Sequence, residues 1–195
     1  MGSAINDNDR VEMPGGVVRA FDARSGTLRW QWDPMPQPSG TAGVWRSGAA
    51  NAWSIMTIDP QRHLVVVPTG SASPDYFGGV RPGDNRWANS VVALRADTGR
   101  LAWGFQLVHH DLWDYDTAPP PLLATLMRGA EQVPVVVQGN KTGFIYMLNR
   151  ETGEPASSID ERPVPRSDVR GEAAFPTQPF PLTLPAVTPQ RLSAD

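Results

Sequence analysis

The segment 108–116 carries the densest group of chemically active side chains in this sequence. It reads VHHDLWDYD, in which two adjacent histidines are followed by Asp111, Asp114 and Asp116. A carboxylate beside a substrate hydroxyl can act as a general base, so one of these aspartates is a candidate for proton abstraction. The residues alone also allow a polar surface loop or a cation site.

His109 and His110 are neighbours, and neighbouring side chains of an extended segment point to opposite faces. We therefore do not expect them to ligate one metal ion together, and the sequence contains no HExxH spacing of the kind found in zinc enzymes. We expect both histidines to orient the loop by hydrogen bonds. The chain has no cysteine, which excludes disulfides, thiolate catalysis and cysteine-ligated zinc.

Two other residues stand out by their chemistry. Lys141 is the single lysine of the chain, since all its other cationic side chains are arginines. Its ammonium can donate to the oxygens of a ligand, or it can lie solvated at the tip of a hairpin. Trp53 can stack against a flat ligand, or it can pack into the core at the start of a strand.

Composition narrows the class of protein. With 20 prolines, 18 glycines and seven tryptophans in 195 residues, the chain is expected to be packed, rich in turns and mostly β. A net charge of −3 argues against nucleic acid as a partner. No apolar run is long enough to cross a membrane, and the first ten residues lack the apolar core of a signal peptide.

Glycine-containing turns divide the chain into the hairpins that must position these side chains. The strings AFDARSGTLRW (20–30) and ALRADTGRLAW (93–103) share one pattern, and MLNRETGEP (147–155) repeats it more weakly. In the first two, a Trp follows the turn glycine by four residues. Glycine supplies the positive φ that such a turn requires.

The predicted strand pairs are 17–21 with 27–32, 53–58 with 63–68, 90–94 with 100–106, and 133–138 with 144–149. Small sheets repeated in this way are typical of propeller blades, and an ordinary β-sandwich is the alternative.

Other stretches lack this pattern. Residues 33–48 form a predicted loop rich in proline and glycine, and PGDN at 82–85 is a predicted turn. Residues 155–195 hold eight prolines, and proline cannot donate to a central sheet ladder. We expect this segment to be loop or disordered.

Between Trp53 and Lys141 the sequence resembles the quinoprotein dehydrogenases that use pyrroloquinoline quinone (PQQ), of the membrane glucose and quinate dehydrogenase type. The strings that carry the resemblance, in family order, are NAWSIMTIDP, VVVPTGSASPD, RPGDNRWANSVVALRADTG, VHHDLWDYD and NKTGFIYMLNRETGEP. The resemblance implies an all-β propeller of eight W-type blades. This chain would supply about three of them: residues 1–154 a partial propeller, and 155–195 a proline-rich tail of the same propeller.

In that family, a motif of Ala, Asp, Gly and Trp joins neighbouring blades. The resemblance places it at Ala20, Asp22, Gly26 and Trp30. It recurs in the second repeat, where Arg95 stands in the aspartate position.

The resemblance also assigns roles within the site. It implies that Asp114 is the general base, that Trp53 stacks on the cofactor, and that Lys141 polarises its quinone oxygens. Asn51 stands where a short polar residue touches the cofactor. For calcium, the implied ligands are Asp114 and Ser71.

Ser71 departs from the pattern, because some family members have a calcium-ligating Asn at this position. Calcium takes six to eight oxygen ligands. Asp75 or main-chain carbonyls are therefore expected to complete the set.

The function implied is oxidation of a hydroxyl of a polyol, sugar or hydroxy acid, with electrons passed to ubiquinone or another quinone in the periplasm. The chain would act with the remaining propeller blades, as a fragment or a split copy. Two alternatives stay open: a propeller scaffold that binds proteins and no cofactor, and an inactive remnant.

Overall fold

The computed structural model describes residues 1–6, 13–35 and 48–191, and the predicted all-β fold is confirmed. Within these residues the only helix is the short 3-10 turn η1 (Gly78–Val80). The strands are β1 (Val18–Phe21), β2 (Leu28–Trp32), β3 (Thr57–Asp59), β4 (Leu64–Pro68), β5 (Ser90–Arg95), β6 (Leu101–Gln106), β7 (Leu122–Arg128), β8 (Glu131–Gly139), β9 (Ile145–Asn149), β10 (Ile159–Pro163) and β11 (Thr177–Pro181).

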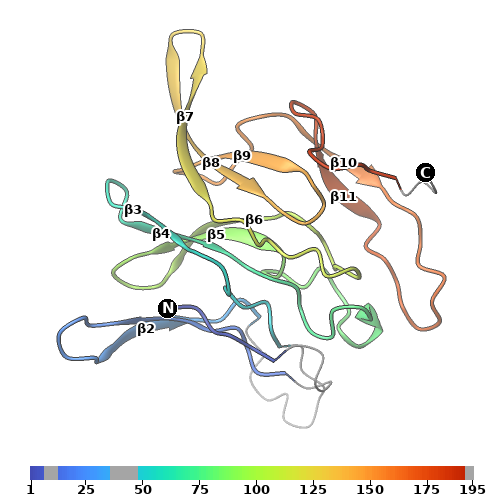
Figure 1. The fold of residues 1–195 in the computed structure, drawn as a ribbon, viewed down its shortest axis with the longest axis horizontal. Helices are drawn as coiled ribbons and strands as arrows, with labels where there is room; N and C mark the ends of the chain where they lie inside the picture. The colour runs from blue at the N-terminus through green and yellow to red at the C-terminus, as the bar shows by residue number, and fades with distance from the viewer. Residues whose placement is uncertain (7–12, 36–47, 192–195) are drawn as a thin grey trace.

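The strands form separate antiparallel sheets that follow one another in chain order (Figure 1). A four-stranded sheet, β3–β4–β5–β6, is followed by a three-stranded sheet, β7–β8–β9. The hairpins β1–β2 and β10–β11 flank them. Successive small sheets of this kind are what the propeller prediction requires.

The two clearest sequence repeats adopt the same hairpin. Ala20 pairs with Trp30 and Ala93 pairs with Trp103, and in both hairpins the register shifts at the next residue. The predicted pairing of 133–138 with 144–149 is also present, as β8 and β9.

Each repeat tryptophan packs into the turn of the following sheet. The Trp30 indole N–H donates to the carbonyl of Ala96 at 2.9 Å, and the Trp103 indole N–H donates to that of Arg150 at 2.9 Å. A Cβ added to Gly99 would lie 2.5 Å from the Trp30 ring, and one on Gly153 would lie 2.6 Å from Trp103. Glycine is therefore needed beneath each ring.

The central sheet β3–β6 is covered on both faces. Val66 and Ala93 face a core that includes Tyr146 of the next sheet. Val67 and Val92, one residue along each strand, face the other way into a core with Trp30 and Trp32 packed against it. Because both faces are buried, β5 is apolar at consecutive positions instead of alternating.

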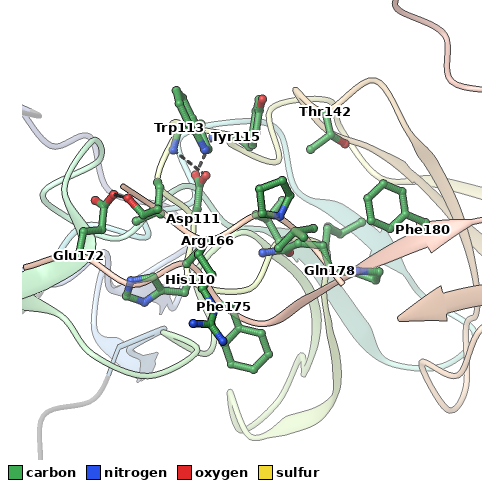
Figure 2. Close-up of a pocket in the computed structure, with 18 of the residues that line it drawn as sticks. His110, Asp111, Trp113, Tyr115, Thr142, Arg166, Glu172, Phe175, Gln178 and Phe180 are labelled. Carbon is green, nitrogen blue, oxygen red and sulfur yellow. Dashed lines mark hydrogen bonds between the residues drawn. The ribbon is translucent and has the colours of Figure 1, made fainter. Parts of the chain in front are cut away.

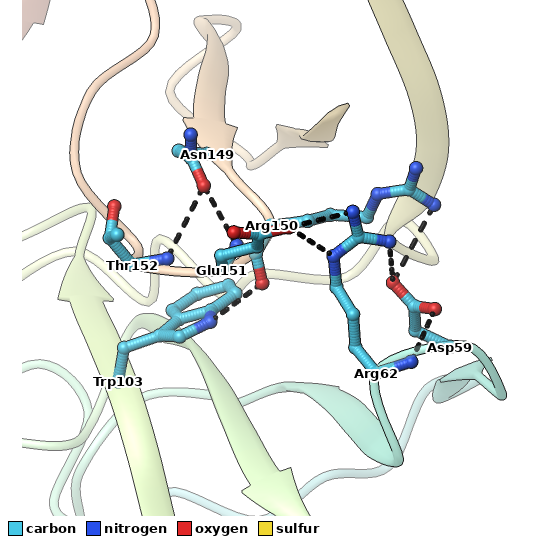
Figure 3. A network of polar contacts seen from close by, with 7 residues as sticks. All are labelled: Asp59, Arg62, Trp103, Asn149, Arg150, Glu151 and Thr152. Atoms are coloured by element: carbon cyan, nitrogen blue, oxygen red, sulfur yellow. Dashed lines mark hydrogen bonds and ion pairs between the residues drawn. The ribbon is translucent and has the colours of Figure 1, made fainter. Parts of the chain in front are cut away.

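A polar network also joins the central sheet to the next one (Figure 3). Asp59 is fully buried and pairs with Arg62 at 3.5 Å and with Arg150 at 3.6 Å. Arg62 reaches on to Glu151 at 2.9 Å. This network lies beside the Trp103 contact, so the junction has both an apolar and an ionic component.

Two expectations need correction. The tail is not all loop, because β10 and β11 form a hairpin within 155–195. The strand expected over 53–58 is restricted to β3, and β7 was not predicted. Most of the loop predicted over 33–48 lies outside the described residues. Among those described, there is no long apolar helix of the kind that crosses a membrane.

Candidate functional site

The candidate site is built from segments that precede or follow the strands. Main-chain hydrogen bonds connect them: Gly70 N–H donates to Asn51 at 3.1 Å, Asn89 N–H donates to Gly70 at 2.8 Å, and Lys141 N–H donates to Asp116 at 3.1 Å. Residues far apart in the chain thus meet at one end of the sheets.

These segments enclose a cavity of about 380 Å³, which we call the acidic cavity. Its polar and aromatic lining consists of Asn51, Trp53, Asp75, Asp114, Asp116 and Lys141, with Ala4 and Ile5 beside them. Four residues singled out from the sequence, Asn51, Trp53, Asp114 and Lys141, therefore lie together. Ser71 is not among the lining residues.

Lys141 bridges two carboxylates at the cavity wall. Its Nζ lies 2.8 Å from Asp114 Oδ2 and 2.7 Å from Asp116 Oδ2. Partial burial raises the pKa of Asp114; the hydrogen bond from Lys141 opposes this and the charge of Asp116 adds to it. Burial opposes the charge of Lys141, but its two carboxylate partners outweigh that cost and raise its pKa above the ordinary value. Asp114 is thus a stronger base than an ordinary aspartate, held beside a cation.

Gly70 allows the close approach of two groups at the cavity. A Cβ at this position would lie 2.6 Å from Asp116 Oδ1 and 3.2 Å from Trp53 Nε1. The side chain of Trp53 is 51 % exposed, so its indole offers a surface to a ligand and does not belong to the core. This argues against the core interpretation of Trp53.

The hydroxyl of Ser71 is used inside the protein. It donates to Asp111 Oδ2 at 2.6 Å and accepts from Asn89 Nδ2 at 2.9 Å. The main-chain N–H of Ser71 donates to Asp116 Oδ1 at 2.8 Å. The structure thus does not bring Ser71 and Asp114 together as a metal pair. Within the described residues, no cluster of three or more His, Cys, Asp or Glu side chains could hold a metal ion.

The histidines contact other protein groups. The ring of His109 lies 2.7 Å from Gln106 Oε1 and 3.0 Å from Glu161 Oε1. His110 Nδ1 donates to the carbonyl of Gly83 at 2.6 Å, and burial lowers its pKa. The hydrogen-bonding role expected for both histidines agrees with this geometry.

A second, larger cavity of about 600 Å³ lies on another side of the 111–115 loop (Figure 2). Trp113, Tyr115, Phe175 and Phe180 contribute aromatic surface, and we call it the aromatic cavity. The same loop that carries Asp114 thus contributes to the walls of both cavities.

The charges of the acidic cavity restrict its ligands. Asp114 and Asp116 share the ammonium of Lys141, and Asp75 interacts electrostatically with the buried cation Arg81. PQQ is flat and anionic, and the Trp53 face and Lys141 suit such a molecule.

Comparison with known proteins identifies the family. A family model described as the β-propeller domain of glucose, ethanol and alcohol dehydrogenases, labelled PQQ, matches residues 1–195. The chain belongs to this family of PQQ-dependent dehydrogenases.

Individual relatives agree with the match to the PQQ family model. The chain is 39 % identical to quinate/shikimate dehydrogenase (quinone) of Acinetobacter baylyi, over 98 % of this chain and 24 % of that protein. It is 38 % identical to quinoprotein glucose dehydrogenase of Escherichia coli, over 92 % of this chain and 23 % of that protein. The chain therefore spans about a quarter of the length of these relatives.

Among solved structures, quinohemoprotein alcohol dehydrogenase from Comamonas testosteroni superposes with a TM-score of 0.67 at 27 % identity. The match covers 87 % of this chain and 28 % of that chain. The fold and the family expected from the sequence are both confirmed.

The resemblance assigns a role to Asp114 and none to Asp116, although Asp116 holds Lys141 as closely. Because Asp114 has a left-handed φ of 60°, the rule that residues two apart on an extended segment share one face does not apply to WDYD. No sequence pattern indicates a role for Gly70. The need for glycine at this position follows only from the close packing of Trp53 and Asp116 against it.

Proposed function

We propose that this chain supplies part of a PQQ-binding catalytic site that oxidises a hydroxyl group. The observation that carries the proposal is the meeting of Trp53, Asp114 and Lys141 in one cavity. Bound in this cavity, PQQ would supply the acceptor for the hydride that leaves the carbon bearing the hydroxyl. Asp114 takes the hydroxyl proton on its carboxylate, and this leaves a carbonyl product.

The other cavity residues bind and orient. The indole face of Trp53 supports the flat ring system. Lys141 would donate to quinone oxygens and so stabilise negative charge there, and Asn51 would contribute a polar contact. Asp116 keeps the ammonium of Lys141 at the same wall as the base. Calcium belongs to the proposal because the resemblance to the PQQ-dependent family implies it.

The names of the relatives support the substrate class. They act on quinate or shikimate and on glucose, and one carries "quinone" in its name. We therefore propose a sugar, polyol or hydroxy acid as substrate, ubiquinone or another quinone as acceptor, and the periplasm as the compartment. Further propeller blades act as partners of this chain.

The test is a titration of the purified chain with PQQ, with and without calcium, followed by tryptophan fluorescence. Saturable quenching that requires calcium and is lost in Trp53→Ala supports the proposal. Trp113→Ala is the matched control, because Trp113 is also exposed but lines the aromatic cavity. No quenching from a chain that circular dichroism shows to be folded would mean that the remaining blades are indispensable to the site, or that the chain is the scaffold or the remnant.

A further inference from the structure

Asp111 is the most heavily bonded carboxylate near the site. It is 2 % exposed, and its oxygens accept four hydrogen bonds. Oδ1 accepts from the main-chain N–H of Trp113 at 3.0 Å, and Oδ2 accepts from that of Tyr115 at 2.6 Å. Figure 2 shows both bonds converging on the carboxylate. Ser71 Oγ and Asn89 Nδ2 supply the other two, at 2.6 Å and 2.9 Å.

The two main-chain donors are the residues on either side of Asp114. Asp114 itself has φ of 60°, a left-handed conformation that residues with a side chain adopt infrequently. One carboxylate therefore restrains both neighbours of a residue whose backbone is in a strained region.

Asp111 is itself anchored from the central sheet. Ser71 follows β4 and Asn89 precedes β5, so both donors sit beside rigid strands. Arg81, also buried, donates to the main-chain carbonyl of Asp111. The loop conformation is thus fixed relative to the central sheet by side-chain hydrogen bonds as well as by the main chain.

From this geometry we infer that Asp111 is a positioning residue, which holds Asp114 in its left-handed conformation and so directs the Asp114 carboxylate at Lys141. Its importance for catalysis rests on the proposed function, whereas the geometric claim does not. Lys141 pairs with Asp114 and Asp116 and not with Asp111; Asp111 acts on Asp114 through the 113–115 backbone.

The single lysine of the chain offers a direct readout. Labelling with 15N-lysine gives one side-chain ammonium signal in an NMR spectrum, and that signal reports the Asp114–Lys141 contact at 2.8 Å. Asp114→Asn defines its position when the charge of Asp114 is removed. All spectra are recorded on the full chain at one pH, without cofactor.

Asp111→Ala should move the Lys141 signal toward its position in Asp114→Asn. Asp111→Asn keeps an oxygen for Tyr115 and should restore at least half of the shift. Asp59→Ala is the control, because it removes another buried, multiply bonded aspartate at a distant junction; it should leave the signal in place.

The inference is overturned if Asp111→Ala leaves the signal at its wild-type position while Asp114→Asn moves it. If Asp111→Ala does not fold, Asp111→Asn decides: a partial shift supports the inference and a wild-type spectrum overturns it. A shift in Asp59→Ala equal to that in Asp111→Ala would also overturn it, because general destabilisation would then suffice.

Cofactor measurements separate this inference from the proposed function. In Asp111→Ala, the PQQ affinity should change less than about threefold, because Trp53 and Lys141 remain, while turnover falls about 100-fold through misplacement of the base. A wild-type chain that binds no PQQ refutes cofactor binding by this chain alone, and the Lys141 signal still tests Asp111. Equal losses of affinity and turnover would contradict a positioning role.

Discussion

The three turn glycines Gly26, Gly99 and Gly153 allow the contribution of the tryptophan contacts between sheets to be measured by comparison. Their φ values are alike, 71°, 70° and 75°, so an alanine at any of them carries the same backbone cost. Their surroundings differ, because Trp30 covers Gly99 and Trp103 covers Gly153, whereas nothing lies within 4 Å of a Cβ at Gly26.

The expected magnitudes follow from this difference. Gly26→Ala should lower the free energy of unfolding by about 1–2 kcal/mol, the cost of a left-handed residue with a side chain. At Gly99 and Gly153 the new methyl would lie 2.5 Å and 2.6 Å from an indole ring. Displacing a packed ring adds about 1–3 kcal/mol, so these two variants should lose about 2–5 kcal/mol.

Urea unfolding followed by circular dichroism measures all three variants against the wild type. Circular dichroism is preferable to fluorescence here, because the substitutions move tryptophans. Equal losses in the three variants would refute the argument, since the stacked rings would then contribute nothing to the junctions.

Three further predictions concern the site. Asp114→Asn should leave PQQ affinity within about threefold of wild type but lower turnover about 10²- to 10⁴-fold, as loss of a general base does. Lys141→Ala should weaken both affinity and turnover, and steady-state kinetics together with the fluorescence titration distinguish the two variants. Normal turnover in Asp114→Asn would exclude Asp114 as the base. Burial and then the charge of Asp116 hold the pKa of Asp114 above 3.8, so its contribution to stability is present at low pH and is lost as the pH rises through the folded pKa. Asp116→Asn should lower that pKa in a carboxyl NMR titration of the metal-free chain; an unchanged value contradicts the electrostatic account. Gly70→Ala should abolish PQQ quenching while the dichroism spectrum stays unchanged, because its methyl would lie 2.6 Å from Asp116 and 3.2 Å from the indole of Trp53; undiminished quenching would show that the cavity tolerates the methyl.

Local sequence signals were sufficient for the hairpins with a glycine turn. The Gly26 and Gly99 turns predicted both strand pairs, and the structure adds the register, which pairs Ala20 with Trp30. The segment before β3 was predicted as strand because it is apolar. In the structure residues 53–56 lie outside the strand, and half-exposed Trp53 lines the acidic cavity.

The β10–β11 hairpin was not predicted, because the prolines of residues 155–195 were taken to exclude a strand whatever their position in the strand register. Leu182 N–H donates to Ser158, and Val164 N–H donates to Pro176. These bonds fix which positions must donate across the pair, and Pro179 and Pro181 fall at the alternate positions. Their missing N–H groups therefore cost no ladder bond.

The site was accessible from the sequence only through family resemblance. Spacing alone did not choose among the three aspartates of the 108–116 segment. The structure distinguishes them by contact: Asp114 and Asp116 hold Lys141, and Asp111 holds the backbone. Such roles depend on the left-handed turn at Asp114, which the residue type does not reveal.

The way each tryptophan docks has a consequence for synthesis on the ribosome. Trp30 meets its carbonyl acceptor 66 residues later in the chain, and Trp103 meets its own 47 residues later. At about 5–20 residues per second, the first delay lasts about 3 to 13 seconds. Throughout that interval a newly made sheet presents an indole with no partner to the surrounding solution. The nascent chain therefore passes through a vulnerable stage once per sheet, in which chaperones or aggregation compete with the arrival of the next turn.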